Sequence, residues 1–480
     1  MFNEIDFSKI DTTGTPPADD AERQYYYMAR LAEMVTAKKQ ELGRPITYCL
    51  QTFGCQMNEK QSEVVAGIMD EIGFTRQETE DADVVIYNTC TVRENANLKV
   101  YGRLGKLHNL KKSNPDMKIA LFGCMMQEKQ VVDKIQKDYP FVNLVFGTHN
   151  IFKFAELFYE MENGDSQLID IWEGTDKIVE ELPTERSYSF KSGVNIMFGC
   201  NNFCSYCIVP YVRGRERSRE PEAIVKEIEA LTKDGVTEVM LLGQNVNSYG
   251  KTLKNPITFA QLLEKVEAIE GLKRIRFMTS HPKDLSDELI EYMGKSKKVC
   301  HHLHLPMQSG SSRILQVMNR RYDKEKYLGL VEKIRKAVPD ISLTTDIIVG
   351  FPGETEEDFL ETLDVVEKSC FDTAFTFIYS KRSGTPAAKM ENQVPEDVVK
   401  DRFDRLLKLV QEKGREASSR FEGEVQEVLV ETESKEKGIF TGRTQYNLLV
   451  HFQGTEDLLG KYINVRLDTC KGFYYMGTRV

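Results

Sequence analysis

The chain has 480 residues, 41% of them hydrophobic and 29% charged, ordinary values for a globular protein large enough for two to four domains. Its longest apolar runs are strand-sized, as in 341–351, and its first residues form no apolar signal core, so we expect neither a membrane span nor secretion. The net charge of −10 argues against nonspecific binding of nucleic acid, although it leaves room for a local basic patch. Ten cysteines in such a chain favour bound metal in a reducing, cytoplasmic compartment over a disulfide framework.

Changes of pattern along the chain divide it into five segments. Residues 1–44 form an amino-terminal extension, with helix-like spacing from Tyr25 to Leu42. A first globular domain at 45–160 and an acidic, irregular linker at 161–190 follow. We expect a larger central domain at 191–415 and a small terminal domain at 416–480, in a chain of the α/β class.

The first globular domain repeats a strand followed by a helix. Three apolar runs each end on a cysteine, and helical stretches begin after them near Glu59, Arg93 and Gln127. The cysteines that end these runs are Cys55, Cys90 and Cys124, separated by 35 and 34 residues. The repeats predict a doubly wound parallel sheet, whose strand ends share the edge where such sheets bind ligands. The three cysteines would then converge as one site. The alternative is that they are small buried hydrophobic residues, as we expect for Cys49, Cys300, Cys370 and Cys470.

The central domain alternates six strand-like runs with helical stretches, such as Glu222–Asp234 and Thr258–Glu270. The runs are Val194–Phe198, Thr237–Gly243, Arg274–Ser280, His301–Met307, Ser342–Phe351 and Thr373–Ser380. Such alternation predicts a parallel sheet curved into a partial (β/α)6 barrel. Polar loops after the strands would give a ring of donors and acceptors for a polar cofactor. From these loops we select Gln244, Ser280, Gln308, Ser309, Arg321 and Asp346 as candidate cofactor contacts.

A short loop after the first of these runs holds Cys200, Cys204 and Cys207 in a CxxxCxxC spacing. Thiolates bind soft metal centres, and iron–sulfur clusters are held mainly by cysteine. Three cysteines would leave the fourth iron of a cubane open to a small ligand. A zinc site would favour CxxC pairs with further ligands close by, and a disulfide suits a secreted protein. The spacing therefore favours a cluster.

A basic run, Arg213-Gly-Arg-Glu-Arg-Ser-Arg219, follows the cysteine loop. It is either a solvated turn or a binding site for phosphates. The second interpretation follows from the ability of arginine to make planar, bidentate contacts with phosphate. From it we predict RNA contacts by Arg213, Arg215 and Arg217.

The terminal segment begins after a long polar helix predicted at Asp397–Phe421. Short β-branched runs at Val425–Glu431, Tyr446–Phe452 and Tyr462–Leu467 are punctuated by glycines, which predicts a small antiparallel β-barrel. From residue 424 this segment has seven Lys or Arg and eight Asp or Glu, so charge alone does not identify it as an RNA binder.

Four motifs resemble those of the radical S-adenosylmethionine (SAM) methylthiotransferase family. They are Thr52-Phe-Gly-Cys-Gln-Met-Asn58, Asn88-Thr-Cys-Thr-Val-Arg-Glu94, Gly123-Cys-Met-Met-Gln127 and Gly199-Cys-Asn-Asn-Phe-Cys-Ser-Tyr-Cys-Ile-Val-Pro-Tyr211. The resemblance runs from about Ile46 to the end and includes a terminal barrel similar to the TRAM domain of that family. Gln61 departs from the pattern, which usually has aspartate there, and the first 44 residues match no motif.

The resemblance implies two 4Fe–4S clusters, one on each cysteine triad. SAM would bind the open iron above the CxxxCxxC loop, and its reductive cleavage would give a 5′-deoxyadenosyl radical, chemistry that belongs to the cofactor. The cluster on Cys55, Cys90 and Cys124 would carry the sulfur that reaches the product, after one SAM has methylated it.

The implied substrate is N6-isopentenyladenosine next to the anticodon of tRNA, which would gain a methylthio group at C2 of the adenine. A base in a single-stranded loop can be splayed out and read without melting a duplex. We expect a monomer that binds the anticodon stem-loop of tRNA, takes electrons from a donor such as flavodoxin and contacts no membrane.

Three alternatives stay open. Sister enzymes of this family act on threonylcarbamoyl-adenosine in tRNA or on an aspartate of a ribosomal protein, while Gln-Met-Asn after Cys55 and the arginine run favour the isopentenyl substrate. A non-catalytic RNA-binding protein with a structural cluster is a third reading. Two 4Fe–4S clusters with only three cysteine ligands each would stabilise a fold poorly, which argues against this third alternative.

Overall fold

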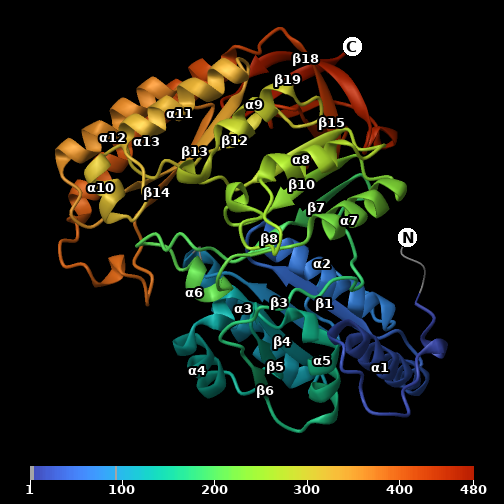
Figure 1. The fold of residues 1–480 in the computed structure, drawn as a ribbon. Coiled ribbons are helices and arrows are strands. Elements are labelled where there is room, and N and C mark those ends of the chain that lie inside the picture. Colours follow the sequence, from blue (N-terminus) through green and yellow to red (C-terminus); the bar gives the residue numbers. More distant parts are fainter. Residues whose placement is uncertain (1–4, 92–93) are drawn as a thin grey trace. The chain divides into compact units, whose positions relative to one another are not determined.

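The structure, a computed structural model, describes residues 5–91 and 94–480 and divides into two compact units (Figure 1). The first unit comprises residues 1–187, 198–200 and 208–217, and the second comprises residues 188–197, 201–207 and 218–480. Within the described part of the chain, every helix is too short or too polar to cross a membrane.

The first unit is built on a six-stranded parallel sheet in the order β2-β1-β3-β4-β5-β6 (Figure 1). Its strands are β1 (Thr47–Thr52), β2 (Thr75–Arg76), β3 (Val84–Thr89), β4 (Lys118–Gly123), β5 (Leu144–Phe146) and β6 (Leu168–Asp170). Its helices are α1 (Asp20–Leu42), α2 (Gln56–Glu71), α3 (Glu94–Ser113), α4 (Lys129–Asp138), α5 (Phe154–Asn163) and α6 (Val209–Arg213).

Separate apolar cores cover the two faces of this sheet. One core joins Met28 of α1, Val65 of α2 and Phe158 of α5 to the sheet, while the other joins Leu104 of α3 and Ile135 of α4. The helix after β1 and the helix after β3 therefore lie on opposite faces. The strand order reverses between β1 and β3, which is the switch point where doubly wound sheets open a ligand-binding crevice.

The doubly wound domain predicted from the sequence is confirmed. The three apolar runs form β1, β3 and β4, whereas the short strands β2, β5 and β6 were not predicted. The predicted helix start at Arg93 lies outside the described residues. The helix expected in the extension is α1, and it packs into the same core as α2 and α5.

The second unit holds six parallel strands in two groups of three, β11-β10-β7 and β12-β13-β14. They are β7 (Lys191–Asn195), β10 (Glu238–Leu242), β11 (Arg274–Met278), β12 (His302–His304), β13 (Ser342–Val349) and β14 (Thr373–Ile378). A parallel bridge between Ile275 and Val299 links the groups. Helices follow the strands: α7 (Pro221–Lys233), α8 (Phe259–Glu267), α9 (Asp287–Lys295), α10 (Ser312–Val317), α11 (Lys324–Ala337), α12 (Glu356–Ser369) and α13 (Glu396–Ser419).

The first predicted strand of this domain was placed too far along the chain. The apolar run Val194–Phe198 was expected to be the strand, but β7 ends at Asn195. Met197 and Phe198 form β8, which pairs instead with β9 (Arg217–Ser218). The reason is that Lys191 and Gly193 pair with β10 although they are not hydrophobic. A prediction based on a run of apolar residues therefore misses the start of the strand.

The terminal segment is a closed five-stranded barrel in the order β15-β16-β17-β19-β18. Its strands are β15 (Val425–Glu433), β16 (Ile439–Arg443), β17 (Leu449–Gln453), β18 (Tyr462–Cys470) and β19 (Tyr474–Arg479). The small barrel is confirmed, although β17 and β19 run parallel and the strands β16 and β19 were not predicted.

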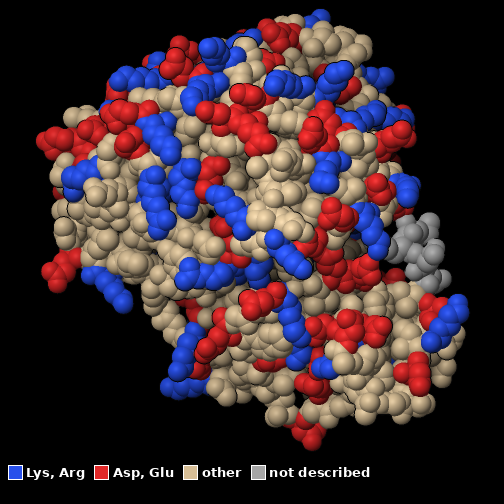
Figure 2. Space-filling view, in the orientation of Figure 1, with Lys and Arg blue, Asp and Glu red and all other residues tan. Residues whose placement is uncertain are grey.

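The barrel is bonded to the central sheet. The Arg276 guanidinium donates to the Thr444 carbonyl at 2.7 Å, and the Tyr446 hydroxyl donates to Asp340 at 2.7 Å. On the face drawn in Figure 2, Lys and Arg lie interspersed with Asp and Glu, so charge there does not gather into one field of a single sign.

Candidate metal centres

Three cysteines of the first unit follow the carboxyl ends of neighbouring strands. In the sheet register, Thr52 of β1 pairs with Asn88 of β3, which pairs with Phe122 of β4. Cys55, Cys90 and Cys124 each come within three residues of this row, and the charges of Cys90 and Cys55 both act on the pKa of Cys124. We call them the strand-end triad. The strands that precede these cysteines therefore end at one edge of the sheet, as predicted, and their common site stays a prediction.

Two buried carboxamides connect the start of α2, which follows β1, to the end of β3. The Asn58 amide donates to Asn88 Oδ1 at 2.8 Å and to the Thr89 carbonyl at 3.1 Å, while the Asn88 amide donates to the Asn58 carbonyl at 2.7 Å. Asn58 Oδ1 also accepts from the Cys55 thiol at 3.2 Å. Both carboxamides have no exposed surface. Because every bond is satisfied in a dry site, this pair fixes the positions of the cysteines that flank it.

Gly123, directly before Cys124, has a positive φ of 103°. A Cβ there would lie 2.5 Å from Asn88 Oδ1 and 2.5 Å from the Thr89 carbonyl oxygen. Glycine is therefore required for β4 to end against the loop that carries Cys90.

Arg213, at the end of α6, is buried beside the strand-end triad. Its guanidinium donates to Asn58 Oδ1 at 3.0 Å and bonds the Cys124 thiol. Burial lowers the pKa of Arg213, but the negative charge of Cys124, Cys55 and Cys90 outweighs it and the pKa is raised. Burial likewise raises the pKa of the Cys124 thiol to about 11, while Arg213 opposes that rise. Arg213 thus offsets part of the cost of holding thiolates in this buried site.

These residues fit an iron–sulfur cluster by their chemistry. The donors are three cysteines outside any disulfide, two of them buried, and the fixed positive charge of Arg213 would offset the thiolates that iron requires. Within the described part of the chain, His, Cys, Asp and Glu form no group of three or more placed around a single ion. Cluster ligands bind separate irons and need not meet at one point.

The three arginines predicted to contact RNA are placed differently from one another. Arg213 is only 5% exposed and faces the cysteines, so its predicted RNA contact has no support in this position. Arg217 is half-buried and donates to the Thr175 carbonyl. Arg215 is exposed, and its contact with RNA stays a prediction.

The CxxxCxxC loop is contributed by both units, Cys200 by the first and Cys204 and Cys207 by the second. In the first unit, the Cys200 amide donates to the Gly214 carbonyl at 3.1 Å. Gly199 has a φ of 71°, and a Cβ on it would lie 2.0 Å from the Arg215 carbonyl oxygen. A common site for the three cysteines, which we call the loop triad, remains a prediction from their spacing.

A turn between α10 and α11 holds the second half of this loop. The Asn319 amide donates to the Phe203 carbonyl at 2.9 Å, and the Ser205 amide donates to the Met318 carbonyl at 3.0 Å. The Cys207 amide donates to the Cys204 carbonyl at 2.9 Å, which closes a tight turn between the two cysteines.

Arg320, in the same turn, is buried against Cys204. Its guanidinium lies 3.5 Å from Cys204 Sγ and donates to the Pro306 carbonyl at 2.8 Å and to the Tyr322 hydroxyl at 3.1 Å. Burial lowers the pKa of Arg320, but Tyr206, Tyr322 and Cys204 outweigh it and the pKa is raised. Sequence reasoning missed this residue and selected its neighbour Arg321, which is exposed.

Unpaired buried polar atoms follow three adjacent strands of the second unit. Among the described residues, Asn195 Oδ1 at the end of β7, Asn245 Oδ1 after β10 and Ser280 Oγ after β11 lack a hydrogen-bond partner. Buried polar groups are normally paired, so such a set fits a polar ligand. Ser280 was predicted from its loop position, whereas Asn195 and Asn245 were not. Gln244, also predicted, is half-buried beside Asn245.

The other predicted cofactor contacts already have partners within the protein. Ser309 Oγ accepts from the Ser311 amide at 3.2 Å and lies 3.4 Å from Thr362 Oγ1. The backbone N–H of Gln308 donates to the Asp346 carbonyl at 2.8 Å, with a φ of 66° at Gln308. Asp346 Oδ2 lies 3.4 Å from His304 Nε2. Their roles as cofactor contacts stay predictions.

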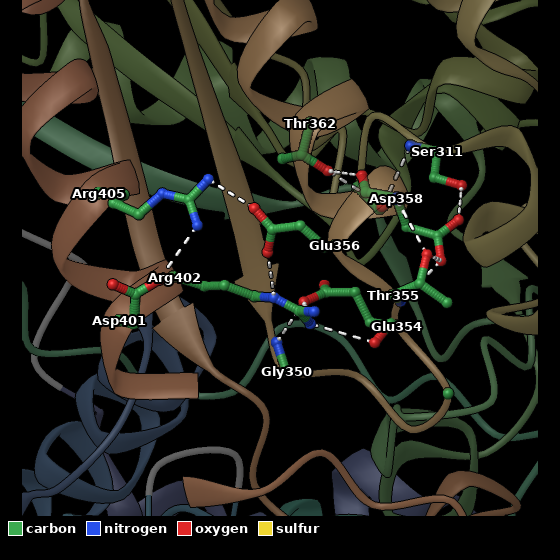
Figure 3. Close-up of polar contacts among 12 residues, drawn as sticks. Ser311, Gly350, Glu354, Thr355, Glu356, Asp358, Thr362, Asp401, Arg402 and Arg405 are labelled. Carbon is green, nitrogen blue, oxygen red and sulfur yellow. Dashed lines mark hydrogen bonds and ion pairs between the residues drawn. The ribbon is translucent and has the colours of Figure 1, made fainter. Parts of the chain in front are cut away.

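The loop after β12 is anchored to the amino terminus of α12 by a carboxylate. Figure 3 shows Asp358 accepting from Ser311 Oγ, at 2.6 Å, and from the Thr355 amide, at 2.8 Å. The Thr362 hydroxyl accepts from the Gly310 amide at 2.9 Å.

The loop after β13 is held by a second carboxylate, also drawn in Figure 3. Glu354 Oε1 accepts from Arg402 Nη1 of α13 at 2.9 Å and from the Gly350 amide at 3.2 Å. Burial raises the pKa of Glu354 to about 7, against the opposing effects of Gly350 and Arg402. Two strand-end loops are thus fixed from the helices behind them.

The other cysteines are mostly packing residues, as predicted. Cys49 and Cys300 are buried and Cys470 is half-buried. Cys370 is exposed at the end of α12, so its prediction as a buried hydrophobic residue was wrong. It ends the helix in the left-handed conformation, with a φ of 48°, which turns the residue out of the core.

Comparison with known families divides the chain into three matches. Residues 47–147 match the family described as "Uncharacterized protein family UPF0004", residues 194–366 match the radical SAM superfamily, and residues 419–480 match the TRAM domain.

Curated relatives match over nearly the whole chain. A protein of Lachnoclostridium phytofermentans named tRNA-2-methylthio-N(6)-dimethylallyladenosine synthase is 65% identical over 91% of this chain and 96% of its own. Proteins of the same name from Acetivibrio thermocellus and Clostridioides difficile are 53% and 52% identical over 96% and 97% of this chain, and over 97% and 98% of theirs.

A solved structure is similar in fold at low identity. The radical S-adenosylmethionine methyltransferase TsrM from Kitasatospora setae aligns with a TM-score of 0.50 at 13% identity, over 71% of this chain and 75% of that one. At this identity the likeness concerns the fold alone.

Proposed function

Because the chain belongs to the family of the curated tRNA-2-methylthio-N(6)-dimethylallyladenosine synthases, we propose that it methylthiolates N6-isopentenyladenosine next to the anticodon of tRNA. It would use SAM both as methyl donor and as radical source. The observation that carries the proposal is the near full-length identity to these relatives, in a chain whose two cysteine triads match the family motifs.

Two 4Fe–4S clusters would supply the electron and the sulfur of this reaction when bound, together with SAM. The first would be held by Cys200, Cys204 and Cys207, and the second by Cys55, Cys90 and Cys124. The buried guanidiniums beside Cys204 and Cys124 support this assignment, because each offsets the charge of thiolates that iron would require.

SAM would lie against the strand ends of the central domain. Asn195, Asn245 and Ser280 offer unpaired polar atoms for its polar groups, and this support is stronger than a loop position alone. Gln244 follows β10, and Gln308 and Ser309 follow β12, while Asp346 lies within β13 and Arg321 in the turn between α10 and α11; these five residues complete the proposed set of contacts.

The tRNA would be bound through its anticodon stem-loop, with Arg215 and the terminal barrel as candidate contacts. An electron donor such as flavodoxin, a monomeric state and a cytoplasmic location complete the proposal.

The first test is the iron and sulfide content after anaerobic reconstitution. We expect about eight irons in the wild type and about four in the Cys200/Cys204/Cys207 triple alanine variant, because each triad would bind one cubane. Four irons in the wild type and none in the triple variant would remove the second cluster from the proposal.

The second test separates the possible substrates. Isopentenylated tRNA, threonylcarbamoylated tRNA and the ribosomal protein are each incubated with the reconstituted enzyme, SAM and a reductant. We expect the methylthio product only with isopentenylated tRNA. Product with either of the other two would transfer the protein to a sister activity, and the absence of 5′-deoxyadenosine under reduction would contradict an enzymatic role.

A further inference from the structure

We propose that Arg213 is a positioning residue for the second cluster, whose fixed positive charge raises the reduction potential of that cluster. The inference rests on the proposed function, since it requires a cluster on Cys55, Cys90 and Cys124. Arg213 belongs to a run that sequence analysis assigned to RNA, and the structure turns its side chain into the protein instead.

The guanidinium is held in place from two sides. Arg213 Nη2 donates to Asn58 Oδ1 at 3.0 Å, and the same oxygen accepts from the Cys55 thiol at 3.2 Å. The guanidinium also bonds the Cys124 thiol. One carboxamide oxygen thus holds the guanidinium of Arg213 next to Cys55, and in the absence of a cluster it also accepts from that thiol.

The backbone that presents Arg213 is anchored within the first unit. The Thr148 hydroxyl donates to the Val212 carbonyl, and Val212 and Ile208 pack against Cys124 in a small buried cluster. Gly214, which follows Arg213, has a φ of 74° and ends α6. The backbone therefore changes direction directly after Arg213, whose side chain remains beside the strand-end triad.

Neighbouring basic groups do not supply the same charge. His149 lies beside Gly214, where a Cβ would be 3.0 Å from His149 Cε1. Burial, with Arg217 and Arg213, lowers the pKa of His149 to about 4, so the imidazole is neutral near pH 7. Arg217 is directed to the carbonyl of Thr175. Among these three basic side chains, Arg213 is the one that bonds a cysteine of the triad.

A fixed cation favours the more negative state of a nearby redox centre. One-electron reduction of a 4Fe–4S cluster adds one negative charge to it, and the potential of such clusters depends on net charge and on hydrogen bonds to their sulfurs. In a buried site a full charge is weakly screened. Removing Arg213 should therefore make the cluster harder to reduce.

The experiment uses the full chain with Cys200, Cys204 and Cys207 replaced by alanine, so that only the second cluster is present. Into it we introduce Arg213→Gln, which removes the charge, and Arg213→Lys, which retains it. Iron content is determined first, and the midpoint potential is then measured by electron paramagnetic resonance in samples poised with dithionite and mediators.

We expect Arg213→Gln to keep about four irons and to show at least a tenfold weaker reduction at a fixed applied potential, which is a lowering of about 59 mV for a one-electron couple. Arg213→Lys should lie closer to the parent. Loss of iron from Arg213→Gln with its retention in Arg213→Lys would show that the charge is needed to bind the cluster rather than to set its potential, and would overturn the inference.

Equal potentials in the parent and in Arg213→Gln would overturn the inference. Loss of iron from both variants, with unchanged circular dichroism, would also overturn it, because shape rather than charge would then hold the site. Absence of iron from the parent itself would instead remove the second cluster from the proposed function. Failure of this inference and failure of the proposed second cluster therefore give different results.

The matched control is Arg76→Gln, in the same parent. Arg76 is an exposed arginine of the edge strand β2, paired with Tyr48 near the amino end of β1, away from the strand ends. Its loss changes net charge by the same amount and should leave the potential unchanged. An equal shift in both variants would show an effect of net charge alone and would overturn the assignment to Arg213.

Discussion

The two cysteine triads are supported in different ways, although a buried arginine bonds a cysteine of each. At the strand-end triad the supports other than Arg213 are neutral, since Asn58 and Asn88 exchange hydrogen bonds between the start of α2 and the end of β3. Around the loop triad they are charged: Arg320 lies against Cys204, and the loops of the same domain are fixed by Glu354 with Arg402 and by Asp358.

The difference follows from how each triad is built. Parallel strands in register place their last residues in one row, so two carboxamides are enough to fix cysteines that lie 35 and 34 residues apart. A CxxxCxxC loop has no ladder to hold it and depends on donors from another segment, here the turn of Asn319 and Arg320. Hydrogen bonds from a charged guanidinium are stronger than those from a neutral amide, so an arginine is suited to hold a loop that has no strand pairing.

The largest expected effect is at Arg320. Arg320→Met removes the donor to the Tyr322 hydroxyl and the nearer donor to the Pro306 carbonyl, which keeps only the Tyr322 hydroxyl at 3.3 Å, so we expect a loss of about 3 kcal/mol in the free energy of unfolding and loss of about half the bound iron. Denaturant unfolding and iron content measure the two effects. The adjacent, exposed Arg321→Met is the control and should change stability by less than about 0.5 kcal/mol. Similar stability of both variants would contradict the contrast between the two triads, because the CxxxCxxC loop would then not depend on a buried arginine.

A smaller effect is expected at the neutral support. Asn58→Ala removes the bonds to Asn88, Thr89 and Arg213, and the unpaired groups left behind should cost about 2 kcal/mol of unfolding free energy. Asn109→Ala, in exposed surface of α3, is the control and should be nearly neutral. Iron bound by the loop triad should be retained in Asn58→Ala, which would show that the two supports act separately. Loss of all iron would contradict that separation.

Sequence reasoning located the strand-end triad because topology alone determines it. Each of the three runs reads as a strand that ends on cysteine, and parallel strands must end at one edge, so Cys55, Cys90 and Cys124 could be brought together without coordinates. The same logic placed Ser280 at a strand end. What it could not give is which side chains already have partners, as Ser309 has and Ser280 has not.

The arginines show most clearly what the sequence alone does not predict. Arg213 stands in a run of alternating arginines that is typical of an exposed turn, and its inward direction depends on α6 and on the left-handed Gly214. The signal available in the sequence was its position next to Val212, within an apolar stretch that begins at Ile208. Arg320 and Arg321 are adjacent, and only backbone geometry decides which of them is buried.

The cofactor contacts give a third, smaller effect. Ser280→Ala removes a hydroxyl that has no partner in the protein, so we expect unchanged or slightly raised stability and about tenfold weaker SAM binding by calorimetry on the reconstituted protein. Ser309→Ala removes a hydroxyl that accepts from the Ser311 amide, and it should lower stability with a weaker effect on SAM. The reverse ranking would show that an unpaired buried atom is a poor guide to this site.

The smallest expected effect is a pH dependence that belongs to the charged supports alone. The pKa of Glu354 in the folded protein is raised to about 7 from an ordinary value of 4.5, so between these values the folded state binds more protons than the unfolded state. Stability from this group is therefore present at low pH and declines as the pH rises towards 7. We expect the wild type to lose about 1 kcal/mol relative to Glu354→Gln between pH 5 and pH 6.

Denaturant unfolding of both proteins at several pH values measures this difference. The exposed Glu391→Gln serves as the control and should run parallel to the wild type. Parallel curves for Glu354→Gln as well would show that Arg402, at 2.9 Å, keeps the carboxylate ionised in spite of burial. The Asn58–Asn88 pair contains no group that titrates in this range, so Asn58→Ala should shift stability equally at every pH. A pH-dependent shift there would remove the distinction between neutral and charged supports.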